Sequence, residues 1–365
     1  KTGTDWQLAA TGVITTPQPE PAEEEREEEQ NLPQPEPAPE PEPAPIPTPK
    51  PTPEPAPVPQ PELTSTADAG ANFLNINYLM NYAETQTLMQ RLGDLRQKKR
   101  GGNVWARGIG GRFDSFGGGK LSAFRLSYSG MQFGVDKQPA PENPMTLGIF
   151  MGSTHGKAHY ASGRGDHSSK HAGLYLSALA DNGLWLDGVV KYARMKNSFS
   201  VRDSQRAKVS GYGAADSYSA SLEGGKRINL TAAAPGFYVE PQLQLSWSRQ
   251  QKDRLVASNG LHVDLDGYHS LLGRASALLG YRVQQQGAQL NLYLKSGMVR
   301  EFKGDTHYRL NGAPERHSFK GNWWNNGLGA SAQIADRHVL YLEGDSSTGG
   351  PFNQRQVNAG YRFSF

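Results

Sequence analysis

The segment Gly344-Asp345-Ser346-Ser347 has the composition of a nucleophilic serine motif. Such a serine needs a general base and an acid beside it, and His167, His171 and His269 are the candidate bases. None of these histidines stands in a motif with an acid. Gly, Asp and Ser are equally the residues expected where a strand runs into a loop. The sequence therefore favours a strand end here over a catalytic site.

Two further patterns could bind ligands. Four histidines lie close enough in sequence to meet on one external loop and hold a metal ion, namely His155, His159, His167 and His171. A group of glycines has the composition of a phosphate-binding loop, at Gly108, Gly110, Gly111 and Gly117 to Gly119. No Gly-Lys-Ser or Gly-Lys-Thr follows them, however. A solvated loop explains the histidines, and strands that pass close to a helix explain the glycines. We predict no metal, no cofactor and no enzyme.

The elements that position any site begin after a long proline-rich segment. Residues 17–62 contain most of the 25 prolines and an acidic run from Glu23 to Glu29. Such a segment stays extended and builds no core, so residues 17–71 are predicted to be a disordered spacer. Residues 1–16 are too short to fold alone, and we predict that they end a larger domain. Because the chain starts at Lys1 without a leader, we expect it to be a fragment of a longer precursor.

A helix is predicted next, in residues 72–102. From Asn72 to Arg100 there is no proline, and apolar residues recur at spacings of three, four and six. Gly101 and Gly102 then end the helical pattern. A helix of this kind packs against a core, and the residues that follow indicate which core that is.

Residues 103–365 show the alternation of apolar and polar residues that is typical of β-strands. No apolar run approaches the roughly 18 residues of a membrane-spanning helix. The alternation is clearest in residues 236–250, where one face is apolar and the other polar. Twelve strands are predicted, at 103–114, 120–135, 143–156, 168–180, 183–198, 212–229, 236–250, 269–284, 288–302, 322–335, 338–346 and 354–365.

The connections between these strands favour a transmembrane barrel over a soluble β-sandwich, which would show the same alternation. Short connections are predicted near 136–142, 181–182, 230–235, 285–287 and 336–337. Long ones are predicted near 157–167, 199–211, 251–268 and 303–321, and the first connection, at 115–119, is a short exception. Outer-membrane barrels alternate short periplasmic turns with long external loops in this way.

Aromatic residues give the second indication of a membrane. Several lie near predicted strand ends, where an interfacial girdle would be, namely Trp105, Phe113, Phe133, Phe237, Trp247, Phe302, Trp323 and Trp324. The last strand also places Tyr361, Phe363 and Phe365 on one face. We therefore predict an all-β membrane protein, in which a 12-stranded antiparallel barrel of residues 103–365 surrounds the helix threaded through its lumen.

Charged residues are dispersed at strand spacing over the predicted barrel, and no nucleic-acid recognition motif accompanies them. We therefore predict no nucleic-acid partner. Buried charges need partners or water, and Glu84 and Asp94 of the helix could pair with charges in the lumen. Nine residues are predicted to point inward: Arg107, Arg125, Lys191, Glu240, Arg274, Arg282, Lys295, Glu343 and Arg362.

The order of these parts resembles the AIDA-type translocator domain of monomeric autotransporters, and the resemblance covers nearly the whole chain. Leu92-Gly93-Asp94-Leu95-Arg96 resembles the motif that closes the α-linker of that family. Tyr361-Arg362-Phe363-Ser364-Phe365 resembles its C-terminal assembly signal. The proline-rich segment resembles the pre-barrel spacer, and Trp6 with its neighbours resembles the end of a passenger β-helix.

The resemblance implies type V secretion at the outer membrane of a Gram-negative bacterium. The N-terminal passenger, expected to be an adhesin, would cross the membrane through or alongside the barrel and be anchored at the cell surface. Outer-membrane lipid, the barrel-assembly machinery, periplasmic chaperones and the passenger are the implied partners. An outer-membrane hydrolase, a protease or esterase, and a soluble adhesive β-sandwich are the alternatives.

Self-cleavage of the linker is a property of some family members, which cut at an Asn-Asn pair. The matching positions in this sequence are Gln86 and Thr87. Because the pair is missing, self-cleavage by that mechanism is not expected. Asn75, Asn77 and Asn81 lie earlier on the same predicted helix and are poor substitutes.

Overall fold

The computed structural model describes residues 63–92, 101–139, 145–231 and 235–365, all of them within the compact unit that spans Pro61–Phe365. The predicted passenger end and most of the predicted spacer lie outside the described residues. No helix in the described ranges is long and apolar enough to cross a membrane.

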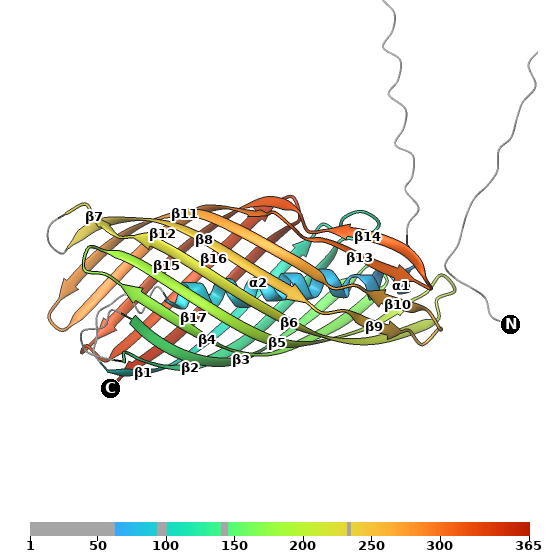
Figure 1. The fold of residues 1–365 in the computed structure, drawn as a ribbon, viewed down its shortest axis with the longest axis horizontal. Coiled ribbons are helices and arrows are strands. Elements are labelled where there is room, and N and C mark those ends of the chain that lie inside the picture. The colour runs from blue at the N-terminus through green and yellow to red at the C-terminus, as the bar shows by residue number, and fades with distance from the viewer. Residues whose placement is uncertain (1–62, 93–100, 140–144, 232–234) are drawn as a thin grey trace, which may run out of the picture. The chain divides into compact units, whose positions relative to one another are not determined.

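Twelve long antiparallel strands close into a barrel (Figure 1), which confirms the predicted fold. Consecutive strands pair around the wall, and the last strand pairs with the first from Asn103↔Ser364 onward. The barrel strands are β1 Gly102–Ser115, β2 Phe124–Lys137, β3 Met145–Tyr160, β4 Gly163–Leu179, β5 Leu184–Arg202, β6 Lys208–Lys226, β8 Gly236–Gln250, β11 Tyr268–Gln285, β12 Ala288–Glu301, β15 Gly321–Ile334, β16 His338–Gly349 and β17 Phe352–Ser364. Both ends of the barrel sequence therefore lie at one mouth, as an even strand number requires.

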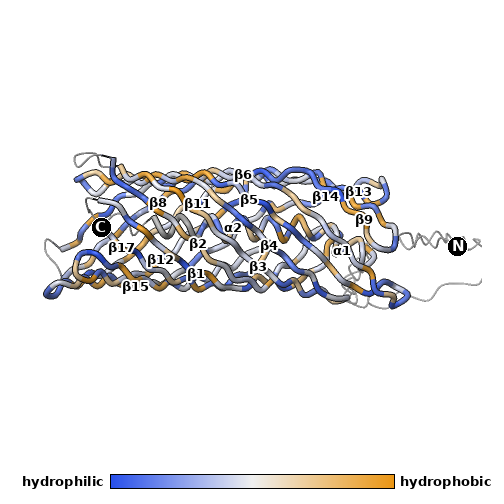
Figure 2. Tube along the Cα trace, turned by 90° about the horizontal axis from the view of Figure 1, so that it is seen from below, coloured by the Kyte–Doolittle hydropathy of each residue, from blue (hydrophilic) through white to orange (hydrophobic). Residues whose placement is uncertain are grey.

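The outer wall near that mouth is apolar. In β8, Leu243 and Leu245 are 69% and 53% exposed, while Gln242 and Gln244, which alternate with them, face inward and are buried. This is the predicted alternation of that strand. Figure 2 shows hydrophobic and hydrophilic residues alternating along the strands. An apolar exterior with a polar interior is the pattern of a barrel wall in lipid.

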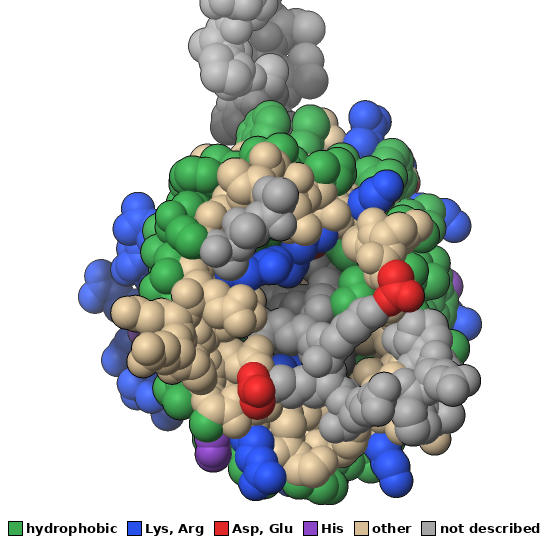
Figure 3. All heavy atoms as spheres, turned by 90° about the vertical axis from the view of Figure 1, so that its left-hand side faces the viewer, with side chains coloured by type: hydrophobic (Ala, Val, Ile, Leu, Met, Phe, Trp, Pro, Cys, Tyr) green, Lys and Arg blue, Asp and Glu red, His purple; other side chains and the backbone are tan. Residues whose placement is uncertain are grey.

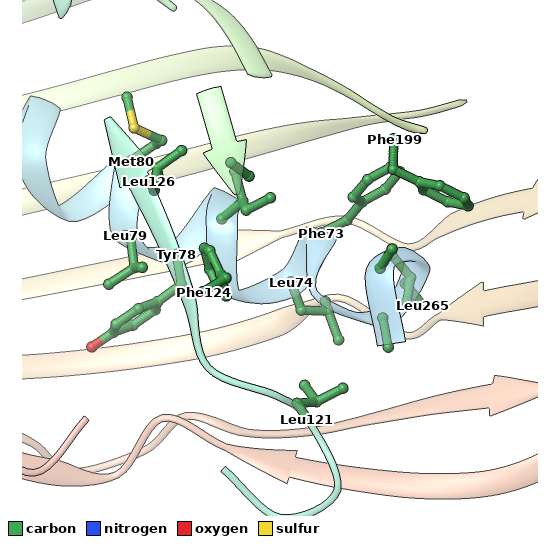
Figure 4. Close-up of a cluster of buried hydrophobic side chains, with 14 of the residues drawn as sticks. Phe73, Leu74, Tyr78, Leu79, Met80, Leu121, Phe124, Leu126, Phe199 and Leu265 are labelled. Atoms are coloured by element: carbon green, nitrogen blue, oxygen red, sulfur yellow. The ribbon is translucent and has the colours of Figure 1, made fainter. Parts of the chain in front are cut away.

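Toward the other mouth, the wall reverses its polarity. In β2, Phe124 and Leu126 point inward and are buried, while Arg125 and Ser127 are exposed on the outside. The reason is that the helix fills the lumen there, and its apolar side chains pack against the inner face of the wall to form a core. Figure 4 shows the cluster, in which side chains of β2 and β5 surround those of the helix.

The helix occupies this core. It consists of α1, Ser65–Ala71, and α2, Phe73–Leu92, joined at Asn72 in helical geometry. Thr64 caps its start, since its Oγ1 accepts a hydrogen bond from the Ala67 amide. The predicted start at Asn72 is therefore seven residues late, and α1 falls inside the predicted spacer. Every side chain from Thr66 to Gln86 is buried, so this part of the helix has no solvent-facing side.

The connections differ from prediction at three places. The predicted long loops near 157–167 and 199–211 are mostly strand, because β3 and β4, and β5 and β6, continue to tight turns at residues 161–162 and 203–207. The first connection is longer than predicted, at residues 116–123, and its Leu121 is buried in the core beside the helix. Where these strands extend above the membrane, their outward-facing residues are polar. The sequence pattern therefore predicted loops there.

The two long connections that were predicted correctly each fold into a hairpin. β9, Asp253–Val256, and β10, His262–Leu265, form one, while β13, Asp305–Leu310, and β14, Ala313–Ser318, form the other. Together they make a four-stranded sheet beyond the barrel wall. Val263 and Leu255 of this sheet pack near Gly70 of α1. At the opposite mouth, the two-residue strand β7, Ile228–Asn229, pairs with β8.

Glycines on the inner face of the barrel receive aromatic rings from neighbouring strands. Tyr238 of β8 stands opposite Gly280 of β11, and a Cβ at that glycine would overlap the tyrosine ring. The arrangement recurs around the wall, at Trp105 and Gly134, Tyr175 and Gly148, Trp185 and Gly225, Tyr293 and Gly329, and Tyr341 and Gly360.

Three of the aromatic residues predicted to lie in the girdle instead point inward. Trp105, Phe113 and Trp323 are buried inside the barrel. The other five are exposed on the outer wall: Phe133, Phe237, Trp247, Phe302 and Trp324. Neighbouring residues of a strand face opposite sides of the sheet, and an aromatic side chain near a strand end can pack either inside the barrel or against lipid. The sequence alone therefore did not determine which face these three residues occupy.

Candidate functional site: the helix-filled lumen

The helix is fixed at its N-terminal end by the loop between β1 and β2. Asp68 Oδ1 accepts a hydrogen bond from the Ser122 backbone amide at 2.8 Å and another from Asn72 Nδ2 at 3.1 Å. Asn75 Nδ2 donates to Asn72 Oδ1 at 2.7 Å. The Asn75 carboxamide oxygen also lies 2.8 Å from Nε2 of His317, in the hairpin β13–β14. The hairpins and the first loop therefore hold α1 at the outer mouth.

Two tyrosines fix the middle of the helix. Tyr78 stacks on Phe319, with ring centroids 4.3 Å apart, and its hydroxyl donates to Glu301 Oε2 at 2.9 Å. One turn further, the Tyr82 hydroxyl accepts a hydrogen bond from Trp323 Nε1 at 3.1 Å. Each tyrosine thus combines a packed ring with a satisfied polar end, as buried tyrosines require.

Glu84 is the only acid among the described residues of α2, and it is fully buried. Its Oε2 accepts a hydrogen bond from Lys191 Nζ at 2.7 Å, and its Oε1 accepts one from Thr154 Oγ1 at 2.6 Å. His171 Nδ1 lies 3.3 Å from the same carboxylate. Strands β3, β4 and β5 therefore bind one carboxylate of the helix. Removing one member of a buried ion pair is costly because the other charge is left unpaired.

Beyond Glu84 along α2, charged side chains of the barrel wall pair with the helix and with one another. Arg274 donates to Gln86 Oε1 at 2.6 Å and to Glu223 Oε1 at 2.7 Å. Lys295 Nζ lies 2.9 Å from Glu343 and 3.1 Å from Asp345. Figure 3 looks onto the mouth at which the barrel sequence begins and ends, and Lys and Arg side chains lie within its opening. The buried charges in this part of the lumen are therefore paired with one another or with polar groups of the helix, as buried charges require.

The structure places eight of the nine predicted lumenal charges on the inner face. Arg282 is half-buried over the Tyr238 ring, and seven are buried: Arg107, Lys191, Glu240, Arg274, Lys295, Glu343 and Arg362. Arg125 was predicted wrongly, since it is exposed on the outer wall, 3.2 Å from Asp114. The polarity reversal in β2 is the reason. Asp94 lies outside the described residues.

The structure describes only some residues of the two predicted motifs, the linker motif and the C-terminal assembly signal. In the Leu92-Gly93-Asp94-Leu95-Arg96 segment, only Leu92 belongs to a described element, as the last residue of α2, and Gly93, Asp94, Leu95 and Arg96 lie outside the described residues. Tyr361 and Phe365 of the C-terminal strand are exposed on the outer face, and Phe363 is half-buried there. His171, Thr154 and His317 were not predicted to touch the helix, and their polar neighbours gave no signal that they would.

The serine segment does not assemble a triad. Asp345 faces inward toward Lys295, Ser346 faces outward, and Ser347 is hydrogen-bonded to Asn325 in the wall. The four clustered histidines lie on β3 and β4 rather than on a loop. His155 and His159 point outward and His167 and His171 inward. In the described part of the chain, no group of three or more His, Cys, Asp or Glu could hold a metal ion.

The His317 contact predicts a loss of stability in acid. Burial lowers the pKa of His317 from 6.5 to about 4, so the folded state disfavours its protonated form. Its stabilising effect is complete above pH 6.5 and is lost as the pH falls toward 4, by up to about 3 kcal/mol. We expect the temperature at which the folded, fast-migrating gel form is lost to fall between pH 7 and pH 4.5. His317→Gln, which can still donate to Asn75, should reduce that fall, and an equal fall in both proteins would contradict the assignment.

Comparisons with known proteins agree with this architecture. A family model described as "Autotransporter beta-domain" matches residues 104–345. The chain is 52% identical over 299 residues to the probable autotransporter YcgV of Escherichia coli (strain K12), covering 82% of this chain and 31% of that protein. It is 33% identical over 290 residues to the pertactin autotransporter of Bordetella bronchiseptica, covering 78% of this chain and 31% of that protein. The chain thus spans less than a third of the length of either relative.

Solved structures give the same result. The β domain of the Bordetella autotransporter BrkA superposes with a TM-score of 0.62 at 26% identity, covering 73% of this chain and 100% of that one. The transport unit of the autotransporter AIDA-I from Escherichia coli superposes with a TM-score of 0.62 at 18% identity, covering 82% and 99%. At 18% identity, the likeness to the AIDA-I transport unit supports the fold alone.

Proposed function

Because the chain belongs to the autotransporter β-domain family, we propose that its barrel carries the segment preceding the helix across the outer membrane and then anchors it at the cell surface. The barrel is an outer-membrane translocator domain of a Gram-negative bacterium. We propose further that the barrel itself catalyses no reaction.

The direction of the helix is the observation that carries this proposal. Both ends of the barrel sequence lie at one mouth, where Asn103 pairs with Ser364. The start of the helix lies at the other, where Asp68 binds Ser122 of the first loop. A chain threaded in this sense has its N-terminal segment outside and its barrel ends on the periplasmic side. The helix then fills the lumen after export.

The family resemblance supports four further proposals. The segment before the helix is an adhesin, as in the autotransporter adhesin/invasin TibA of Escherichia coli, which is 24% identical over 269 residues. Tyr361, Phe363 and Phe365 form the signal for the barrel-assembly machinery, with periplasmic chaperones acting before it. Residues 1–16 end the passenger, residues 17–64 space it from the barrel, and Leu92 with Gly93 to Arg96 closes the linker. Gln86 and Thr87 leave the linker uncut.

Export can be tested on intact cells. A secretion signal and an epitope tag are placed before Lys1, and the cells are treated with a protease that cannot enter them. We expect more than about 80% of the tag to be cleaved, because a threaded helix places it outside. A chain that ends at Ala313 lacks the last three barrel strands, β15, β16 and β17, and should leave the tag protected. A protected tag on a barrel that still migrates faster unboiled would contradict export but leave the barrel fold intact.

A further inference from the structure

The outer wall carries a cationic face above the apolar band, on strands β3 to β5. We define this cationic face by its exposed basic side chains, which are His155, Lys157, His159, Arg164, Lys170, Arg194 and Lys196. On β5 the outward apolar side chains end at Val190 and Tyr192, and Arg194 and Lys196 follow them. At a strand tilt of about 40°, these two cations stand roughly 5 and 10 Å above Tyr192.

Strand pairing brings the face together. Lys157 of β3 stands opposite Asp166 of β4, and Lys196 of β5 stands opposite Ser168 of β4. Between them lies a groove of about 540 Å³, in which Ser127, Ser198 and Tyr212 add hydroxyl groups. The small side chains in the middle of this wall leave the groove open, while the lysines stand at its sides.

Most of these cations form no ion pair with any residue that the structure describes. Arg194 is bound to Asp216 at 2.9 Å. Among the residues that the structure describes, no carboxylate lies within ion-pair distance of Lys157, Lys170 or Lys196, although Asp166 shares the groove. Elsewhere on the barrel, exposed cations such as Arg300 of β12 and Arg355 of β17 stand on separate strands. On β3 to β5, seven exposed basic side chains stand on three consecutive strands.

We propose that the cationic face binds the phosphorylated head group of the glycolipid that forms the outer leaflet. A ligand at this height must lie beside the barrel wall, where the hydrocarbon ends and the head groups begin. The face offers unpaired ammonium groups and hydroxyl donors, which match phosphate oxygens. Tyr192 and Tyr218, exposed just below on β5 and β6, lie at the level of an interfacial girdle. The lipid would thus be held by one side of the barrel only.

The test measures lipid binding to the full chain, purified in detergent, by native mass spectrometry. Lipid A with both phosphates is compared with its dephosphorylated form. We expect the phosphorylated lipid to bind roughly tenfold or more tightly, and Lys157→Gln/Lys196→Gln to remove that preference. Arg300→Gln/Arg355→Gln removes the same number of exposed cations elsewhere and should bind like the parent chain.

Two results would overturn the proposal. One is equal binding of the two lipids by the parent chain. The other is an equal loss of binding in the two double variants, which would indicate general electrostatic attraction rather than a built face. Both variants should remain heat-modifiable and export the tagged segment, so a failure here is distinguishable from a failure of the proposed translocator function.

Discussion

Replacing Glu84 by alanine is expected to open the lumen. The substitution leaves Lys191 buried without the carboxylate that now lies 2.7 Å from its Nζ, and breaking a buried pair in this way costs about 3–5 kcal/mol. Because Glu84 binds three strands of the wall, that cost falls on the seated position of the helix. In planar bilayers, we expect the Glu84→Ala barrel to conduct for at least about ten times the fraction of time of the parent barrel.

A second variant separates the pairing from the packing. Glu84→Gln/Lys191→Met removes both charges, while the glutamine can still accept a hydrogen bond from Thr154. Replacing a buried pair by neutral groups of similar volume is often nearly neutral in free energy, so this barrel should stay as closed as the parent. If Glu84→Ala conducts no more than the parent, the ion pair does not hold the helix.

Replacing Gly280 by valine is expected to prevent the barrel from reaching its heat-modifiable form. A Cβ at this position overlaps the Tyr238 ring, and overpacking costs about 1–3 kcal/mol or more. The ring is also held by two polar contacts. Its hydroxyl donates to Asn291 at 2.7 Å, and the Arg227 guanidinium lies 4.4 Å from its centroid. Moving the ring therefore also breaks these contacts.

Gly344 provides a matched control in the same wall. It lies within β16, and a Cβ there would meet nothing within 4 Å. Gly344→Val should refold like the parent chain, because valine suits a strand surface that faces lipid. The comparison is the fraction of each refolded protein that migrates faster without boiling. Equal fractions for the two valine variants would show that the ring-on-glycine contact is not needed.

The barrel could be predicted from the sequence because the half of its wall nearest the mouth where the barrel sequence begins and ends follows one rule. From Phe237 to Trp247, for example, every second residue is apolar and faces outward, and the same rule placed Lys191, Arg274 and Lys295 on the inner face. The rule depends on lipid outside and polar groups inside. It fails where either condition changes, as at Arg125.

The remaining features depend on contacts between distant parts of the chain. The hairpin strands β9 and β10 have four residues each, which is too short for a period of two to be recognised. Thr154 and His171 reach Glu84 from separate strands, and in sequence they resemble any other polar residue of a strand. The start of α1 was missed because small residues such as Ala69 and Gly70 give no apolar stripe, although the narrow lumen requires them.

The way the helix is bound also determines how the molecule would bear force. Its polar contacts reach sideways to the wall at successive levels, through Asp68, Tyr78, Glu84 and Gln86. A pull on Leu63 along the barrel axis would load these contacts together, in shear, rather than peel them off one at a time. The closed ring of hydrogen-bonded strands cannot widen without breaking its ladder. Tension on the segment that precedes the helix would therefore be resisted by the whole helix at once.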